Sequence, residues 1–361
     1  MAARNSMDPY AFLDSPTGPS ESERALERIE RRLRGSKSPA GFEEQDEDEE
    51  EWELSALDAR SPLIEELWTL LLDVVFTPLV LRVRAAALLN ACFVAQPAAL
   101  RVERSNAHWL RSIVSSTCQA LAELQATDAQ GAEQLFTWLA FLENVLSASP
   151  DDAFAAVMGH SMYAGMLTKM VRLLTNSSTE VFAATSMCLA LLHAHEVRTQ
   201  PQGQGGRSRR VLIGEVLSGP VNGREHVGEA LLHVINSCGC PCLPSRRVHL
   251  CNCLNLLGDI LADDKAAELV FVNDVKVLVD IIVRECTDLP PEDPTRLLYL
   301  VVLDRTLAAP VFLQAQRYRR RDVWSLLESL LATDSRSDTR LPLETGRLLQ
   351  QLLVRHVDLL D

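Results

Sequence analysis

Cysteine and histidine gather in one stretch of the chain and form its most metal-like feature. The residues concerned are Cys238, Cys240, Cys242, His249, Cys251 and Cys253. Zinc prefers such ligands, but its sites usually place about two to four residues between paired cysteines. Here only one residue separates them, and the last three lie on a predicted helix among leucines and valines. Because a buried cysteine behaves as a small apolar residue, we predict packing positions and no metal or other cofactor.

Other candidates for catalysis are equally weak. His193 and His195 lie two residues apart near a predicted helix end, so they should face different directions and act as satisfied helical histidines. Gly203, Gly205 and Gly206 follow no strand pattern, which excludes a dinucleotide fingerprint, and the chain has no phosphate-binding loop motif. We therefore expect a protein that is not an enzyme.

Two clusters of arginine offer charge for binding instead. One is Arg207, Arg209 and Arg210, and the other is Arg317, Arg319, Arg320 and Arg321, which lies beside Tyr318 and Trp324. Either cluster is explained by a solvated loop or helix end, or by contact with an acidic partner. The neighbouring aromatic residues favour the second cluster as a partner-binding site.

The composition supports a protein with a sizeable core and a protein partner. Hydrophobic residues make up 47% of the 361 residues, mostly Leu, Val and Ala, and of these Leu and Ala favour helices. The net charge is −14, of which residues 1–60 carry −8, so we expect no nucleic-acid partner. Residues 1–10 are polar and no apolar run is long enough to span a bilayer, so we expect no secretory signal, no membrane insertion and reduced cysteines in the cytoplasm.

Residues 1–60 have the composition of a disordered acidic region. Within them, Leu26, Ile29 and Leu33 follow a capping-box pattern at helical spacing, which predicts a short helix that either docks or stays solvated. An acidic run from Glu43 to Glu53 follows and contains Trp52. Such a run of like charge repels itself and stays extended.

Residues 61–361 show helical periodicity almost throughout and no strand pattern. Predicted helices cover 80–94, 108–124, 133–146, 152–157, 163–174, 181–195, 226–237, 245–262, 265–271, 274–287, 294–308, 310–317, 321–332 and 343–358, after a first helix that begins at Pro62. A low-complexity stretch predicts a flexible loop over 198–225. We predict an all-α, armadillo/HEAT-like helical-repeat solenoid, with room for about seven repeats, and a compact helical bundle as the alternative.

One segment is specific enough to resemble a known family. Residues 271–293 have the sequence FVNDVKVLVDIIVRECTDLPPED, and Tyr299, Leu300 and Leu303 follow on the next predicted helix. This pattern resembles the leucine-rich domain of the WISH/DIP family of SH3-interacting proteins, over roughly residues 245–332. Asp274 can cap the helix that starts at Val275, and Asp280 and Arg284 are spaced to pair. We predict that Lys276, Asp280, Arg284 and Asp288 form an exposed, partner-facing edge.

The resemblance implies a function. Members of this family bind the Arp2/3 complex and activate it without a pre-existing filament, producing linear actin filaments that seed branched networks. Actin is then reached indirectly, and the expected location is cytoplasmic actin, at cortical or endocytic patches. The sequence shows no SH3 pattern and only one PxxP, from Pro16 to Pro19, so SH3 partners are not expected. The alternative is a generic armadillo-type adaptor for another protein.

The acidic run adds a second candidate contact. Asp48, Glu49, Glu50, Glu51 and Trp52 resemble the acidic tail by which WASP-type factors bind the Arp2/3 complex. A tryptophan in an apolar pocket, with carboxylates on a basic rim, would suit such binding. An acidic linker explains the same residues equally well.

Overall fold

The computed structural model describes residues 20–33, 62–95 and 107–360, apart from 127, 176, 201–210, 240, 291 and 337–341. Within these ranges the regular elements are all helical, as predicted. None of the described helices is long and apolar enough to cross a bilayer. The chain divides into two compact units, Met1–Ala99 and Leu100–Asp361.

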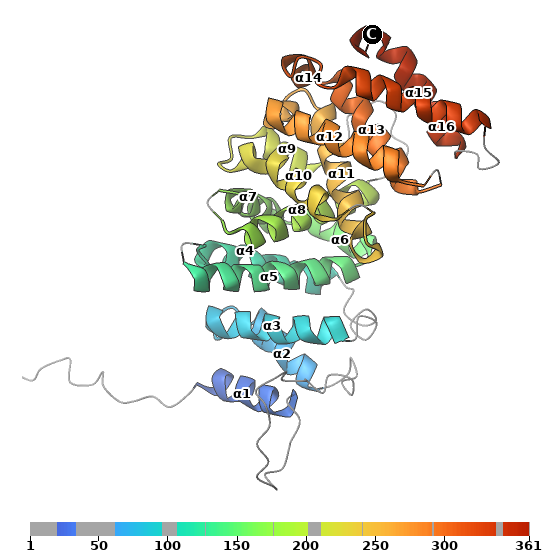
Figure 1. The fold of residues 1–361 in the computed structure, drawn as a ribbon. Helices are drawn as coiled ribbons and strands as arrows, with labels where there is room; N and C mark the ends of the chain where they lie inside the picture. The colour runs from blue at the N-terminus through green and yellow to red at the C-terminus, as the bar shows by residue number, and fades with distance from the viewer. Residues whose placement is uncertain are drawn as a thin grey trace, which may run out of the picture. The chain divides into compact units, whose positions relative to one another are not determined.

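The first unit contains α1 (Glu21–Leu33), α2 (Pro62–Leu72) and α3 (Leu79–Ala95) (Figure 1). The Ser20 side chain caps α1 by accepting from the N–H of Glu23 at 3.2 Å. Leu26 and Ile29 are fully buried, and α1 contacts both other helices. The short helix predicted after the capping box is therefore confirmed, and of its two alternatives docking is observed, because the apolar side of α1 packs on α2 and α3. This packing also sets the unit boundary after Ala99 and not at residue 60.

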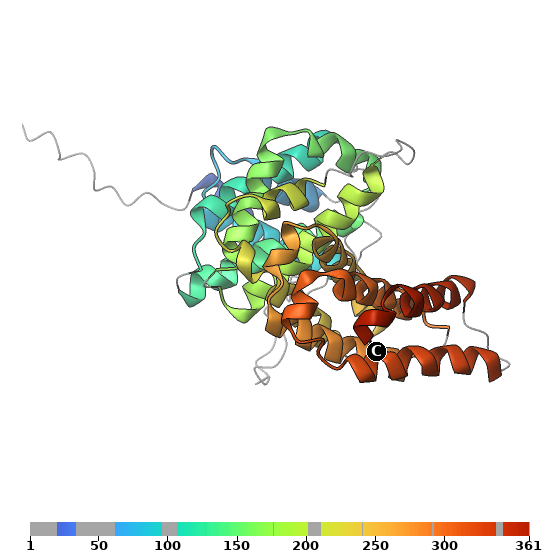
Figure 2. The ribbon, with the colours of Figure 1, turned by 90° about the horizontal axis from the view of Figure 1, so that it is seen from above.

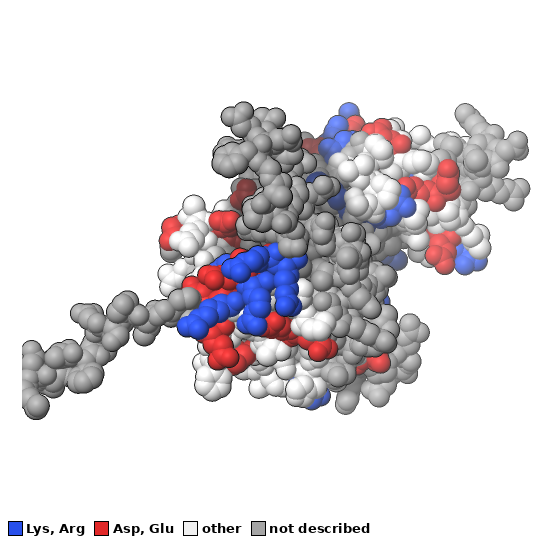
Figure 3. Space-filling model, turned by 90° about the horizontal axis from the view of Figure 1, so that it is seen from below, with Lys and Arg blue, Asp and Glu red and all other residues white. Residues whose placement is uncertain are grey.

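The outer face of α1 is cationic. Arg24, Arg28, Arg31 and Arg32 are exposed, and their spacing places them on one side of the helix, away from the buried leucine and isoleucine. Figure 3 shows the resulting patch of Lys and Arg, bordered by acidic residues. Arg28 lies 4.0 Å from Glu66 of α2, and Arg84 of α3 pairs with Glu30 at 2.8 Å. The helix thus joins an apolar inner face to a basic outer face.

The second unit contains fourteen α-helices among its described residues, and most of them lie where helices were predicted, whereas α9 lies within the predicted loop. They are α4 (Ala107–Glu123), α5 (Ala129–Ala148), α6 (Asp151–Met158), α7 (Ser161–Leu173), α8 (Thr179–Thr199), α9 (Leu212–Ser218), α10 (Val227–Ser237), α11 (Arg247–Ala262), α12 (Val272–Asp288), α13 (Pro294–Ala308), α14 (Pro310–Gln314), α15 (Arg320–Arg336), α16 (Leu343–Arg355) and α17 (Val357–Leu360). The segment expected as a helix over 265–271 is a short 3-10 turn, Ala266–Leu269.

Helices of the second unit stack in succession along the chain. One series of contacts runs α5, α8, α11, α13 and α16, and another runs α10, α12 and α15. At the C-terminal end α15 and α16 lie side by side as a long pair (Figure 2). Each layer buries its apolar residues against the next, which is consistent with a helical solenoid.

The expected flexible loop over 198–225 is largely ordered. Helix α8 continues to Thr199, and α9 packs on α7 and α8 with Ile213 and Leu217 buried. Gly223 then turns with φ 92°, where a Cβ atom would lie 2.3 Å from the carbonyl oxygen of Val171. The prediction extended the loop too far, because apolar residues follow the low-complexity stretch directly; residues 201–210 themselves lie outside the described residues.

Polar side chains occupy the interior around the end of α8. The Glu196 carboxylate accepts from the Tyr163 hydroxyl at 2.7 Å and from the Ile213 N–H at 3.2 Å. His193 contacts Asp259 of α11 at 3.0 Å, whereas His195 contacts Asp151 of α6 at 2.8 Å. The two histidines therefore face different helices, as their spacing predicted. These bonds tie α8 to α6, α7, α9 and α11.

Candidate protein-interaction surface

Helix α12 begins one turn earlier than predicted. It starts at Val272, and Asp274 lies inside its first turn, where its carboxylate accepts from the N–H of Phe271 at 3.0 Å. Asp274 thus caps the helix from within and not from the preceding position. A carboxylate here also favours the positive end of the helix dipole.

One face of α12 forms part of the core. Its buried apolar residues are Val275, Leu278, Val279, Ile281, Ile282 and Cys286. Val277 is 47% exposed, whereas Glu285 is only 3% exposed. The remaining positions, including Lys276 and Asp280, form an edge that solvent reaches.

The connection between α14 and α15 has an unusual backbone. Gln316, Arg317 and Arg319 have φ values of 56°, 53° and 52°, in the left-handed region that favours glycine. A residue with a Cβ atom pays roughly 1–2 kcal/mol for this conformation. The helix predicted over 310–317 therefore ends at Gln314. None of the three residues is glycine, so this turn could not be predicted from residue types.

Side chains of this connection bind α12. Arg319 pairs with Asp280 at 2.7 Å and with Asp322 at 2.7 Å. The Tyr318 hydroxyl donates to Asp280 at 3.4 Å, and the Lys276 ammonium lies 5.9 Å from the centroid of the Tyr318 ring. These contacts hold the strained turn in place.

Lys276, Tyr318 and Arg319 line a recess of about 490 Å³, together with Arg317 of the same connection. We name the assembly the Tyr318 surface, and it consists of Lys276, Asp280, Arg317, Tyr318 and Arg319. It brings together four residues of the two predicted partner-binding groups, from α12 and from the arginine cluster. Arg320 and Arg321 follow directly in the first turn of α15, where Arg321 is exposed. A surface with mixed charge and an aromatic ring suits a protein partner.

Arg284 and Asp288 lie elsewhere on α12. Arg284 donates to Glu285 at 2.9 Å and to Asn236 of α10 at 3.3 Å, so its bonds differ from the predicted pair with Asp280. The prediction considered only α12 itself, whereas Asp280 finds its cation on the α14–α15 connection. Arg284 therefore supports the buried Glu285, and Asp288 is exposed at the last residue of the helix.

The predicted acidic contact lies outside the described residues. It comprises Asp48, Glu49, Glu50, Glu51 and Trp52.

In the cysteine-rich stretch, the described Cys238 and Cys253 are buried, whereas Cys242 and Cys251 are half-buried. His249 contacts Glu143 of α5 at 3.3 Å, and Cys253 is fully buried. Burial raises the pKa of Cys238 to about 11, so its thiol stays protonated at neutral pH. The described residues contain no group of three or more metal-ligating side chains, and Cys240 lies outside them.

Comparison with known families supports the resemblance in the sequence. Residues 167–323 match the family described as SPIN90/Ldb17, leucine-rich domain. These residues belong to that family. The match runs from within α7 to the start of α15, so it contains the whole of α12 and the Tyr318 surface. The match begins well before residue 245, where the resemblance noted in the sequence starts. It agrees with the WISH/DIP assignment. No curated protein matches the chain.

Proposed function

We propose that this chain binds the Arp2/3 complex and activates it without a pre-existing filament, so that linear filaments form and seed branched networks. The family match over 167–323 carries the proposal, because the SPIN90/Ldb17 domain is linked to actin regulation. An armadillo-like stack of helices gives a rigid scaffold for such binding. The chain would act in the cytoplasm at cortical or endocytic actin.

Activation in this scheme is a shift between conformations of the partner. The chain must bind the active arrangement of the two actin-related subunits more tightly than the inactive one. The nucleotide belongs to the partner, so the chain itself needs no cofactor. We assign the contact to the Tyr318 surface with Arg320 and Arg321, because its side chains are exposed or half-buried and the backbone of Arg317 and Arg319 is held in a strained form.

Polymerisation of fluorescent actin with purified Arp2/3 complex tests the proposal. The chain should shorten the lag phase and give mostly unbranched filaments under the microscope. Absence of any acceleration with a cognate complex would contradict it. Capture of other proteins without Arp2/3 subunits would favour the alternative, a generic helical-repeat adaptor.

Charge reversal tests the assigned surface. Lys276→Glu combined with Arg321→Glu should slow nucleation without lowering the melting temperature. Lys265→Glu is a matched control, because Lys265 is exposed beside the Ala266–Leu269 turn, outside the surface. Equal nucleation by both variants would place the contact elsewhere on the chain.

A further inference from the structure

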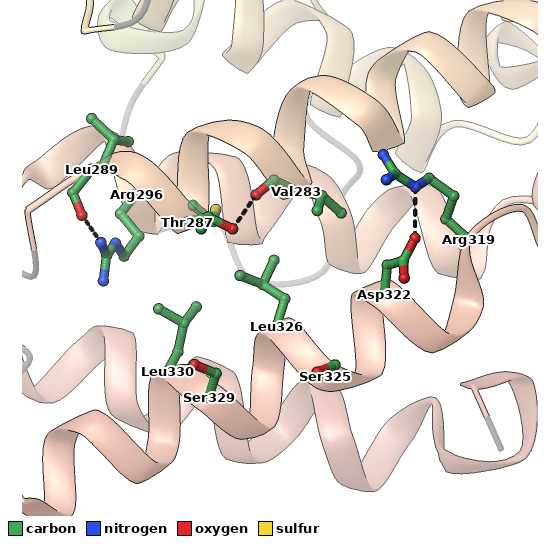
Figure 4. A pocket seen from close by; sticks show the side chains of 11 residues that line it. Val283, Thr287, Leu289, Arg296, Arg319, Asp322, Ser325, Leu326, Ser329 and Leu330 are labelled. Carbon is green, nitrogen blue, oxygen red and sulfur yellow. Dashed lines mark hydrogen bonds and ion pairs between the residues drawn. The ribbon is translucent and has the colours of Figure 1, made fainter.

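A second recess lies between α12 and α15, and it differs from the Tyr318 surface. It has a volume of about 540 Å³, which falls within the usual range for ligand sites of about 300–1,000 Å³. Val283 and Thr287 line it from α12, and Ser325, Leu326 and Leu330 line it from α15 (Figure 4). Its walls therefore alternate apolar side chains with exposed hydroxyls. We call it the Arg296 recess, after the cation at its inner end.

Arg296 is a buried cation with too few partners. Its side chain comes from α13, is 4% exposed and lines the recess. Among the described residues its guanidinium donates only to the carbonyl oxygen of Leu289, and its Nε atom is buried without an acceptor. Burial lowers the pKa of this guanidinium. A buried charge without a partner is costly, and an arginine side chain offers five donors.

Neighbouring carboxylates are committed to other groups. Asp322, which lines the recess, binds Arg319 at 2.7 Å. Asp293 accepts from the Thr295 N–H at 2.9 Å, and its other oxygen lies 3.4 Å from Arg247. Asp293 and Glu292 attract Arg296 at a distance, but among the described residues neither provides it with a hydrogen bond.

We propose that the Arg296 recess binds an aspartate or glutamate side chain of a protein partner, flanked by aliphatic residues. The carboxylate would accept from the Arg296 guanidinium and from the exposed Ser325 hydroxyl, whereas the Thr287 hydroxyl already donates to the Val283 carbonyl oxygen at 2.7 Å. Aliphatic neighbours of the acidic residue would contact Val283, Leu326 and Leu330. Of the residues of the Tyr318 surface only Arg319 also lines this recess, and the proposal does not depend on the partner being the Arp2/3 complex.

Two short peptides test the charge requirement on the full chain. Acetyl-Leu-Glu-Leu-amide carries one carboxylate, and acetyl-Leu-Gln-Leu-amide has the same shape without it. In NMR spectra of protein with ¹⁵N-labelled arginine, the glutamate peptide should move the Arg296 Nε–H signal in a saturable way. The glutamine peptide should need a roughly ten- to hundredfold higher concentration to produce the same shift of the signal. Equal effects of the two peptides, or none up to their solubility limit, would overturn the proposal.

Two variants separate binding from folding. Arg296→Met keeps the volume and removes the cation, so it should abolish the glutamate response while leaving the melting temperature equal or higher. Ser325→Phe should fill the recess and also abolish the response with Arg296 intact. Glu328→Phe, on the same helix but outside the recess, is the control and should bind normally. Normal binding by Ser325→Phe would contradict the proposed position.

A phosphate group is the main competing ligand, since arginine and hydroxyls also bind phosphate. Inorganic phosphate in the same NMR titration distinguishes the two. We expect the glutamate peptide to bind more tightly than phosphate, because its leucine side chains would contact the apolar walls of the recess. Binding of phosphate in the absence of any peptide response would assign the recess to phosphorylated ligands and refute our proposal.

Discussion

Glu196 is a carboxylate held inside the second unit. Burial raises its pKa from the ordinary 4.5, although hydrogen bonds from Tyr163 and Ile213 oppose this change. The folded state therefore binds this proton more tightly than the unfolded state. The stabilisation that follows from the raised pKa of Glu196 is present below about pH 4.5. It is lost as the pH rises through the pKa of the folded state.

Replacement of Glu196 by Gln should expose this pH dependence. Gln cannot ionise, and it can accept from Ile213 while donating to the Tyr163 oxygen. We expect the unfolding free energy of Glu196→Gln, relative to the parent, to rise between pH 5 and pH 7. Urea unfolding at both values measures it. Glu196→Ala is the control, since it leaves two buried donors unpaired and should cost about 1–3 kcal/mol at either pH.

Arg284 and Lys276 both lie on α12 but differ in what depends on them. Arg284 hydrogen-bonds the buried carboxylate of Glu285, whereas Lys276 lies over the half-buried ring of Tyr318. Arg284→Ala should therefore destabilise the second unit by about 1–3 kcal/mol. Lys276→Ala should change its stability by no more than about 0.5 kcal/mol. Denaturant midpoints measure both, and a larger effect at Lys276 would contradict this assignment.

On α12, the polar positions could be predicted from the sequence, but the partners of their side chains could not. The sequence marked Lys276, Asp280 and Arg284 as polar positions on an apolar helix, and periodicity suffices for that. It could not show that Asp280 pairs with Arg319, because such a contact depends on how α15 returns to α12. It also gave no sign that Glu285 is buried and Val277 exposed.

At the scale of elements, the α14–α15 connection stores backbone strain. Gln316 is exposed at φ 56°, where glycine avoids the steric cost. We expect Gln316→Gly to stabilise the second unit by about 0.5–1 kcal/mol. Gln314→Gly, at the last residue of α14, is the matched control and should destabilise it by a similar amount. Thermal unfolding of both variants checks the sign of each change.

For helix α1, the sequence predicted the helix itself but not its contacts with α2 and α3. Its capping residue and apolar spacing were visible in the sequence, so a helix was predictable. Docking was not, because it depends on the complementary surface of α2 and α3. Since Leu26 is fully buried there, Leu26→Ala should cost the first unit about 2–5 kcal/mol. Helical circular dichroism during urea unfolding would report an earlier transition, and an unchanged curve would show that α1 contributes little.

For the whole molecule, most helices were predictable because each buries a regular apolar face. Their assembly was less predictable, because armadillo and HEAT repeats follow a regular period, whereas the short helices α9 and α14 interrupt the succession of long ones. The division after Ala99 depends on α1 joining α2 and α3, which no pattern within 61–361 reveals.

Because the chain divides into two units, an experiment can show which unit carries the proposed activity. The Tyr318 surface and the family match both lie within Leu100–Asp361, whereas the acidic run with Trp52 belongs to Met1–Ala99. We expect a chain of residues 100–361 to reach the same maximal nucleation rate as the full chain at saturating concentration. Calorimetry should show its melting transition unchanged from the corresponding one in the full chain, because that unit has its own core. A correctly folded 100–361 chain with a lower plateau would instead assign an essential contact to residues 1–99, with the acidic run and the arginine face of α1 as the segments to vary next.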